Sequence, residues 1–343
     1  MKISLIVSTA LAASFVLSGC TQPKPIKKTT VKTVKVKSYN NQTVIILDNE
    51  LAEKSVVDAG SASRLPAQKY TAIGDYFGSY NILQNKGIII SKYNITNSYK
   101  VFSSDIWFFG MGKTRLTNTS YFNSDPSMSK DEKFVYFVSN RGKRALGTYD
   151  QTSYIWRMSS KGNGGLTRIG TAMNYISQPI ESPDGKKLLF SAKEFAGQKE
   201  MIWFMGKNGE MPTQLKEGRQ AVWLDNNSIV FTAKDSGTGL YSIWKMNLDG
   251  SLLTQIITDK NLHCIQPAPS PDGKYIAFVK QNGAHSNERD IYIYNIKTGL
   301  TDQITTNKSR DDLPRWSQDK QYVYFRSSRG LSWNVWRIKT DLK

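Results

Sequence analysis

Residue types that dominate metal and redox sites are scarce in this sequence. Its 343 residues include two histidines, His263 and His285, and two cysteines, Cys20 and Cys264. With so few of these residues, the chain cannot form a His-rich metal site. The motifs HExxH, CxxC, G-x-S-x-G and G-x-x-x-x-G-K-[ST], which mark metal, redox, nucleophile and phosphate sites, are also absent. His263 and Cys264 do not form a dyad by adjacency, because neighbours on an extended strand point to opposite faces. We therefore expect no metal, no cofactor and no catalytic residue.

The N-terminal apolar run is too short to cross a membrane. It extends from Ile3 to Val16, which is 14 residues, whereas a transmembrane helix needs about 20. It follows a basic start and precedes Leu17–Cys20 (LSGC), an arrangement that resembles the signal and lipobox of a bacterial lipoprotein. The resemblance implies removal of residues 1–19 and a lipid anchor on Cys20, with an uncleaved anchor as the alternative. Lipidation leaves Cys264 without a partner, so we expect a buried thiol and no disulfide.

Acidic residues are outnumbered by basic ones. The chain has 46 Lys and Arg against 28 Asp and Glu, a formal charge of +18. Residues 20–40 contain the lipobox cysteine and six lysines without an acid. This segment is either a basic tether that lies on anionic lipid or reaches toward the cell wall, or a solvated linker. Charge alone also suits nucleic acid, but export argues against that partner.

A turn followed by a short strand occurs twice in nearly the same letters. Ser182–Phe190 reads SPDGKKLLF and Ser270–Phe278 reads SPDGKYIAF. Proline sets φ for the second position of a tight turn, Asp accepts backbone donors, and Gly takes the positive φ. The apolar residues that follow are typical of the second strand of a hairpin. The expected structural turn residues are Asp184, Gly185, Asp272 and Gly273.

Further copies of this unit make a regular series. Copies begin at positions 126, 179, 221, 267 and 314 and end at Phe137, Phe190, Phe231, Phe278 and Phe325. Each is followed by an Ile-Trp, Ile-Tyr or Val-Trp pair, and an earlier Ile-Trp pair at 106–107 indicates a sixth unit. A period in the forties with about four short strands is typical of β-propeller blades. Residues 70–343 are therefore predicted to form six four-stranded blades, in an all-β fold. The alternative, a β-sandwich, gives no reason for the repeated order.

The last unit lacks an outer strand of its own, because the sequence given stops soon after Val335-Trp336. An unpaired edge is unfavourable. Residues 41–69 precede the first blade, and the apolar run Thr43–Leu47 within them is predicted to pair in the last blade and close the ring.

The repeat resembles that of TolB-type propellers, which are built from WD40-like (PD40) repeats. The features that carry the resemblance are SPDGK before an apolar strand, an S-x-R-G loop at Ser139–Gly142 and Ser327–Gly330, the Ile-Trp pair, and a strand ending in LT. Such repeats occur in periplasmic partner-binding proteins, in accessory domains of peptidases and in carbohydrate enzymes. TolB itself carries an α/β domain before its propeller, which the stretch between Cys20 and the first blade at residue 70 is too short to supply. The resemblance thus implies a TolB-like lipoprotein.

Two opposite rims are expected for the ring. The SPDG turns join the first and second strands and line one rim, whereas the S-x-R-G loops and the segments that lead into the innermost strands line the other. A partner over the central channel would meet the second rim. The residues that we predict to bind there are Arg141, Arg329, Asp125, Tyr175, His263 and Asp312.

The leading hypothesis is a non-catalytic, monomeric lipoprotein of the cell envelope. Its propeller would lie in the periplasm, anchored through Cys20, with the inner leaflet of the outer membrane favoured, and would bind a protein or peptidoglycan. One alternative is a propeller enzyme acting on carbohydrate or peptide, since carboxylates such as Asp125, Asp311 and Asp312 from different blades can form a site. Another is a component of a Tol-Pal-type system for envelope integrity or transport.

Overall fold

The computed structural model describes most of the repeat region and short parts of the N-terminal region. The described residues are 35–39, 42–46, 52–56, 62–70, 77–83, 87–95, 101–141, 152–162, 164–195, 197–283, 288–329, 332–340 and 342. The signal peptide, Cys20 and His285 lie outside them. The chain divides into two compact units, residues 1–48 and 49–343. Within the described ranges, no helix is long and apolar enough to span a bilayer.

The first unit contains a single described hairpin. β1 (Lys35–Tyr39) pairs antiparallel with β2 (Gln42–Ile46). Two residues separate the strands in the sequence, so this pairing costs little chain entropy.

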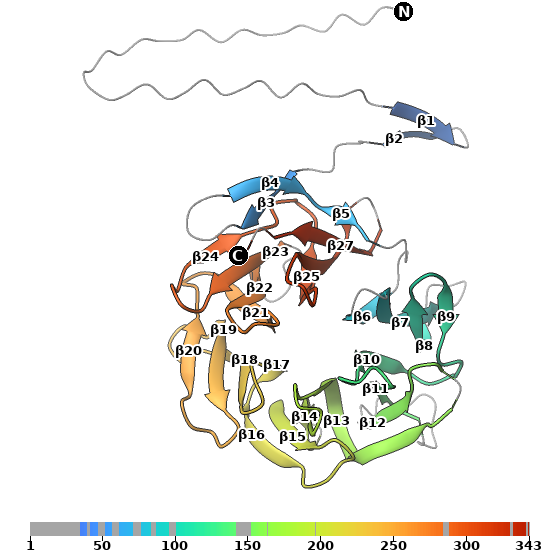
Figure 1. Cartoon of the computed structure of the whole chain (residues 1–343), viewed down its shortest axis with the longest axis vertical. Coiled ribbons are helices and arrows are strands. Elements are labelled where there is room, and N and C mark those ends of the chain that lie inside the picture. The colour runs from blue at the N-terminus through green and yellow to red at the C-terminus, as the bar shows by residue number, and fades with distance from the viewer. Residues whose placement is uncertain are drawn as a thin grey trace, which may run out of the picture. The chain divides into compact units, whose positions relative to one another are not determined.

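The second unit is built from antiparallel sheets that form six blades, with the first strand of each blade toward a common centre (Figure 1). Blade one contains β6 (Phe77–Leu83), β7 (Gly87–Ile95), β8 (Val101–Phe109) and β9 (Lys113–Arg115). Blade two contains β10 (Asn123–Met128), β11 (Phe134–Ser139), β12 (Thr152–Ser159) and the first half of β13 (Thr167–Glu181). Blade three contains the second half of β13, β14 (Lys187–Lys193), β15 (Met201–Gly206) and β16 (Thr213–Glu217).

The remaining blades follow the same order. Blade four contains β17 (Arg219–Trp223), β18 (Ser228–Lys234), β19 (Tyr241–Asn247) and β20 (Thr254–Ile257). Blade five contains β21 (His263–Pro269), β22 (Tyr275–Gln281), β23 (Arg289–Asn295) and β24 (Thr301–Gln303). Blade six contains β25 (Asp311–Trp316), β26 (Tyr322–Ser327), β27 (Asn334–Lys339) and β5 (Gln68–Lys69). The predicted all-β propeller of four-stranded blades is confirmed.

The two repeated sequence marks are cross-strand partners. In the second and third strands, Phe137 pairs with Trp156, Phe190 with Trp203, Phe231 with Trp244, Phe278 with Tyr292 and Phe325 with Trp336. All five phenylalanines are essentially buried. Large aromatic pairs stabilise adjacent strands and fill the space between blades. The repeat in the sequence is thus a repeat of core packing.

The predicted closing segment is wrong, although a strand from the N-terminal side does pair in the last blade. Residues 43–46 pair with β1, and Leu47 lies outside the described residues. The outer strand of blade six is β5, in which Lys69 pairs with Trp336 and Gln68 with Arg337. A second hairpin, β3 (Ala52–Val56) with β4 (Ala62–Pro66), precedes β5 and contacts β27.

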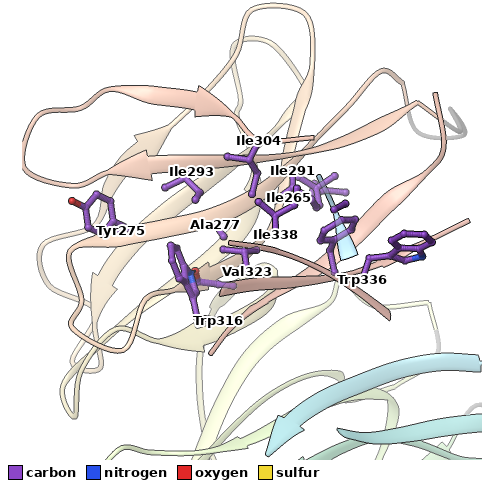
Figure 2. Packing of buried hydrophobic residues seen from close by; sticks show 14 residues of the cluster. Ile265, Tyr275, Ala277, Ile291, Ile293, Ile304, Trp316, Val323, Trp336 and Ile338 are labelled. Carbon is purple, nitrogen blue, oxygen red and sulfur yellow. The ribbon is translucent and has the colours of Figure 1, made fainter. Parts of the chain in front are cut away.

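Contacts on both sides of β5 hold this short strand in place. Ala67 is fully buried in the apolar cluster between blades five and six. Figure 2 shows Ile291, Ile304, Ile338 and Trp336 of that cluster. On the other side of the strand, the Tyr70 N–H donates to the Val335 carbonyl at 2.9 Å, and the Tyr70 ring meets Tyr324 edge-on at 4.9 Å.

Every innermost strand is interrupted at the same point. The ladder between the first and second strands shifts register in all six blades. In blades two to six the residue at the interruption has a positive φ, and these residues are Asp125, Gln178, Gln220, Gln266 and Leu313. Such a bulge leaves a backbone N–H outside the ladder, and a buried N–H needs an acceptor.

The acceptor comes from the preceding blade. Ser79 Oγ accepts from the N–H of Asp125 at 2.9 Å. In the same way, Gln220 Oε1 accepts from Gln266 N–H at 3.0 Å, and Gln266 Oε1 accepts from Leu313 N–H at 2.8 Å. Side chains of the innermost strands therefore link neighbouring blades by hydrogen bonds to the bulge of the next strand.

Enlarging Ala67 tests the closing segment. Ala67→Leu is expected to lower the free energy of unfolding by about 1–3 kcal/mol, because the larger side chain must displace residues of the cluster that buries Ala67, as measured by urea denaturation. The control is Gln68→Leu, whose side chain is exposed. Equal stability of the two variants would contradict the role of Ala67.

Candidate functional site

The SPDG turns line one face of the propeller, which we call the turn rim. Ser182 Oγ donates to Asp184 at 2.6 Å and Ser270 Oγ donates to Asp272 at 2.7 Å. Gly185 and Gly273 have φ values of 69° and 68°, which glycine adopts without strain. The Ser and Asp side chains therefore form hydrogen bonds that stabilise each turn.

A salt bridge joins two adjacent turns on this rim. Lys320 Nζ lies 2.6 Å from Asp272 Oδ2. Partial burial opposes ionisation of Asp272, but hydrogen bonds from Lys320, Ser270 and the Lys274 N–H lower its pKa to about 2.

The opposite face, which we call the loop rim, contains the connections between second and third strands and the starts of the innermost strands. All six residues that the sequence predicted to bind a partner belong to this side. They do not converge on one site.

Arg141 and Arg329 have equivalent positions inside their blades. The Arg141 guanidinium lies 5.2 Å from the Phe137 ring and 5.3 Å from the Trp156 ring, and its Nη2 donates to Asn123. Arg329 lies 5.0 Å from Phe325 and 5.2 Å from Trp336, and its Nη2 donates to Asp311 at 2.6 Å. Both arginines are buried. Each arginine thus lies over the Phe-Trp pair that recurs in the blades, and this packing gives both residues a structural role.

Asp312 is the centre of a charged cluster between blades five, six and one. Its buried carboxylate accepts from Arg326 at 2.7 and 2.8 Å, from Arg310 at 3.0 Å and from Arg289 at 3.3 Å. Burial alone raises the pKa of Asp312, but the arginines, Arg326 foremost, lower it below its usual value. Arg326 also donates to the carbonyls of Phe77 and Gly78. The cluster therefore joins the last blade to the first.

Asp125 and His263 are also occupied by internal contacts. Burial raises the pKa of Asp125, against hydrogen bonds from Ser124 and Ser79. His263 Nδ1 accepts from the Tyr241 N–H at 2.9 Å. Burial, together with Arg219 and Lys234, lowers the pKa of His263. The imidazole is thus held in its neutral form at neutral pH.

Tyr175 differs from the other five residues because it is exposed. Its side chain is 46% accessible and its φ is 53°. The Lys193 ammonium lies 4.7 Å from its ring centre. β13 passes from blade two to blade three at this point, since Asn174 pairs with both Thr152 and Lys193.

A cavity of about 630 Å³ opens beside Tyr175 on the loop rim. It lies between blades two and three, and its walls include Phe122, Asn140, Ser153, Tyr175, Lys193 and Glu200. Phe122 is also exposed. Burial raises the pKa of Glu200, whereas Arg219 and Lys193 lower it. Aromatic faces beside a few polar groups are the usual composition of a binding pocket.

Of the residues that line this cavity, only Tyr175 was predicted from the sequence to bind a partner. Phe122 lies far from Lys193 and Glu200 in the chain, and no motif connects the three residues. The one available signal was Phe122, a large apolar residue in the polar stretch NTSYFNS just before an innermost strand.

A second cavity, of about 350 Å³, opens at the centre of the turn rim. All six blades contribute to it, through Asn81, Met128, Ile180, Val222, Ala268 and Arg315. Among the described residues, no group of three or more His, Cys, Asp and Glu side chains is placed to hold a metal ion.

The architecture and its loop-rim cavity define a β-propeller with features of a binding module. No family model matches the chain. Over 316 residues it is 28% identical to the Tol-Pal system protein TolB of Francisella tularensis subsp. tularensis, and the match covers 86% of this chain and 69% of that protein. An uncharacterized protein of Agrobacterium fabrum is 26% identical over 170 residues, which cover 48% of this chain and 54% of the relative. The chain thus spans about half the length of the Agrobacterium relative.

Solved structures agree on the fold. TolB from Acinetobacter baumannii superposes with a TM-score of 0.60 at 21% identity, covering 76% of this chain and 62% of that one. The β-propeller domain of the Trilobed protease from Pyrococcus furiosus gives a TM-score of 0.52 at 15% identity, with coverages of 77% and 83%. The chain folds as a β-propeller and is similar to TolB, as the repeat predicted.

Replacing Arg326 tests the junction of the first and last blades. Arg326→Met is expected to lower the free energy of unfolding by roughly 3 kcal/mol, because it removes the main partner of a buried carboxylate. Chemical denaturation measures the change. The matched control is Arg310→Met, since the Arg310 side chain is 28% exposed and its loss is expected to cost less. A larger loss in the control would overturn this assignment.

The pKa of Asp272 predicts an acid dependence. Because its folded pKa lies below the ordinary 3.8, the carboxylate stabilises the fold above pH 4, and this contribution is lost as the pH falls from about 4 to about 2. Asp272→Asn should therefore be less stable than the parent at pH 6, and the difference should vanish near pH 2. Thermal unfolding across this range checks it; a difference that does not change with pH would exclude the effect.

Proposed function

We propose that this protein is a non-catalytic lipoprotein of the cell envelope that binds a protein partner at its loop rim. Cys20 anchors the chain, and the propeller lies in the periplasm. The likeness to TolB of the Tol-Pal system supports an envelope role with a protein partner, and peptidoglycan is the alternative partner.

One observation carries the binding proposal, namely the cavity between blades two and three. Phe122 and Tyr175 expose aromatic surface there, although most large apolar residues of the propeller are buried. Aromatic residues near polar groups are the usual anchors of protein interfaces. Lys193 and Glu200 add one charge of each sign, which favours a polar peptide segment over a purely apolar ligand.

The backbone at Tyr175 supports the same interpretation. A left-handed φ is unfavourable for a large side chain and is tolerated best by Gly and Asn. Tyr175 is 46% exposed, so burial offsets only part of this cost. An exposed tyrosine at such a position is better explained by an interaction with a second molecule than by folding.

Photo-crosslinking in cells identifies the partner. A photoreactive residue in place of Phe122 is expected to capture a defined envelope protein, whereas the same residue in place of Gln214, which is exposed on the outer strand β16, is expected to capture none. Tyr175→Asn should reduce binding of that protein about tenfold or more, without loss of stability, because Asn accepts the left-handed backbone.

Two results would contradict the proposal. Equal capture at positions 122 and 214 would remove the cavity from partner binding. Sedimentation of the full chain with purified peptidoglycan, abolished by Tyr175→Asn, would make the cell wall the partner instead.

A further inference from the structure

One arginine of the propeller lacks the interactions that the others make. Every other arginine whose side chain the structure describes pairs with a carboxylate, donates to an amide or lies over an aromatic ring. Arg315, on the innermost strand β25 of blade six, has none of these interactions with the described residues. Its guanidinium makes one hydrogen bond to them, from Nη1 to the carbonyl of its neighbour Pro314 at 2.8 Å.

Arg315 lines the cavity of about 350 Å³ at the centre of the turn rim, which we call the channel cavity. The residue is partly buried. Burial lowers the pKa of Arg315, whereas Tyr80 and Asp125 raise it. A guanidinium remains charged even so, and a partly desolvated charge without a counterion is unfavourable. Folding alone therefore does not explain an arginine at this position.

Asp125 does not neutralise this guanidinium. Its carboxylate is near enough to affect the pKa of Arg315, but no ion pair joins the two residues. The carboxylate instead accepts hydrogen bonds from Ser124, Ser79 and the Gln178 N–H. Burial raises the pKa of Asp125, so its charged form is itself disfavoured.

The walls of the channel cavity supply no other partner for the guanidinium. Among the described lining residues, Glu181 is the single acid. It accepts from the Lys130 N–H and the Tyr136 hydroxyl, and the Lys130 side chain, which also lines the cavity, offsets its charge. The turn carboxylates, Asp184 and Asp272 among them, are hydrogen-bonded within their turns and are not part of the wall. The guanidinium is thus the unbalanced charge of the cavity.

The walls also offer apolar surface. Trp223 and Trp316 line the channel cavity, and both indole N–H groups are already used. Trp223 Nε1 donates to the Ile180 carbonyl at 3.0 Å, and Trp316 Nε1 donates to the Ala268 carbonyl at 2.8 Å. The indoles therefore present apolar surface without a free donor. One cationic group beside apolar walls is the composition that complements a compact organic anion.

We propose that the channel cavity binds a small organic acid, whose carboxylate pairs with Arg315 and whose apolar body lies against Trp223 and Trp316. Because Pro314 uses only Nη1, the Nε and Nη2 edge of the guanidinium can donate two parallel hydrogen bonds to one carboxylate. A volume of about 350 Å³ is at the lower end of the range for ligand pockets, so it suits a molecule with one ring or a short branched chain. This site goes beyond the proposed partner binding and lies on the opposite face.

Isothermal titration calorimetry of the full chain with benzoate tests the site. Benzoate combines a carboxylate with one apolar ring, and we expect saturable binding at a single site. Acetate has only the charge and benzyl alcohol has only the ring, so each is expected to bind about tenfold more weakly or less. Absence of saturable benzoate binding would overturn the proposal, as would acetate or benzyl alcohol that binds as tightly as benzoate.

Variants of Arg315 assign the binding to its guanidinium. Arg315→Met is expected to weaken benzoate binding about tenfold or more, because a charge-assisted pair is lost. Its thermal midpoint should be unchanged or higher, because the substitution removes an unbalanced, partly buried charge. Arg315→Lys keeps a charge without the planar fork and should restore part of the affinity.

The matched control is Arg168→Met, because Arg168 is an exposed arginine on β13 outside the cavity wall. Its benzoate affinity should equal that of the parent. Benzoate binding by Arg315→Met that is as tight as binding by the parent, or an equal loss in Arg168→Met, would overturn the role of Arg315.

Discussion

The unpaired N–H at the bulge of each innermost strand is the constraint on which the propeller depends. The bulge turns the backbone at the channel, and the N–H that it frees is accepted by the neighbouring blade, through Ser79, Gln220 or Gln266. Asp125 does the same for Gln178, whose N–H donates to its carboxylate. Asp125, Gln220 and Gln266 thus each set both the shape of their own strand and its attachment to the next blade. At the junction of the last blade with the first, the apolar side chain of Leu313 cannot accept a hydrogen bond from blade one, and Tyr80 and Arg326 bridge the blades instead.

The local part of this fold was readable from the sequence because it repeats. The Ser-Asp pair and Gly of each turn, and the Phe with its Trp partner across the strands, act over short distances and recur in each unit. The closing strand was not readable, since residues 43–47 look more strand-like than Gln68 and Lys69. What selects β5 is the buried Ala67 and the position of Tyr70, which depend on the assembled blade.

The candidate site was readable only in part for a similar reason. Tyr175 could be placed on the correct rim from strand order, but the cavity beside it requires Phe122, Lys193 and Glu200 from two blades. Arg141 and Arg329 illustrate the opposite case. Their loop motif is regular because each guanidinium covers an aromatic pair of the blade, so a repeated charged residue indicated packing. The exposed aromatic residues of the loop rim, Phe122 and Tyr175, therefore lie outside every repeated motif.

The short strand β5 gives the molecule a mechanical weak point. Only Gln68 and Lys69 pair with β27, and the chain that leads to the N-terminus enters the last blade through them. Tension on that chain would load two backbone pairings and the buried methyl group of Ala67 before it reached any strand of the other five blades. A propeller held at its N-terminus would therefore yield at blade six first, and the edge of β27 would be the surface that opens.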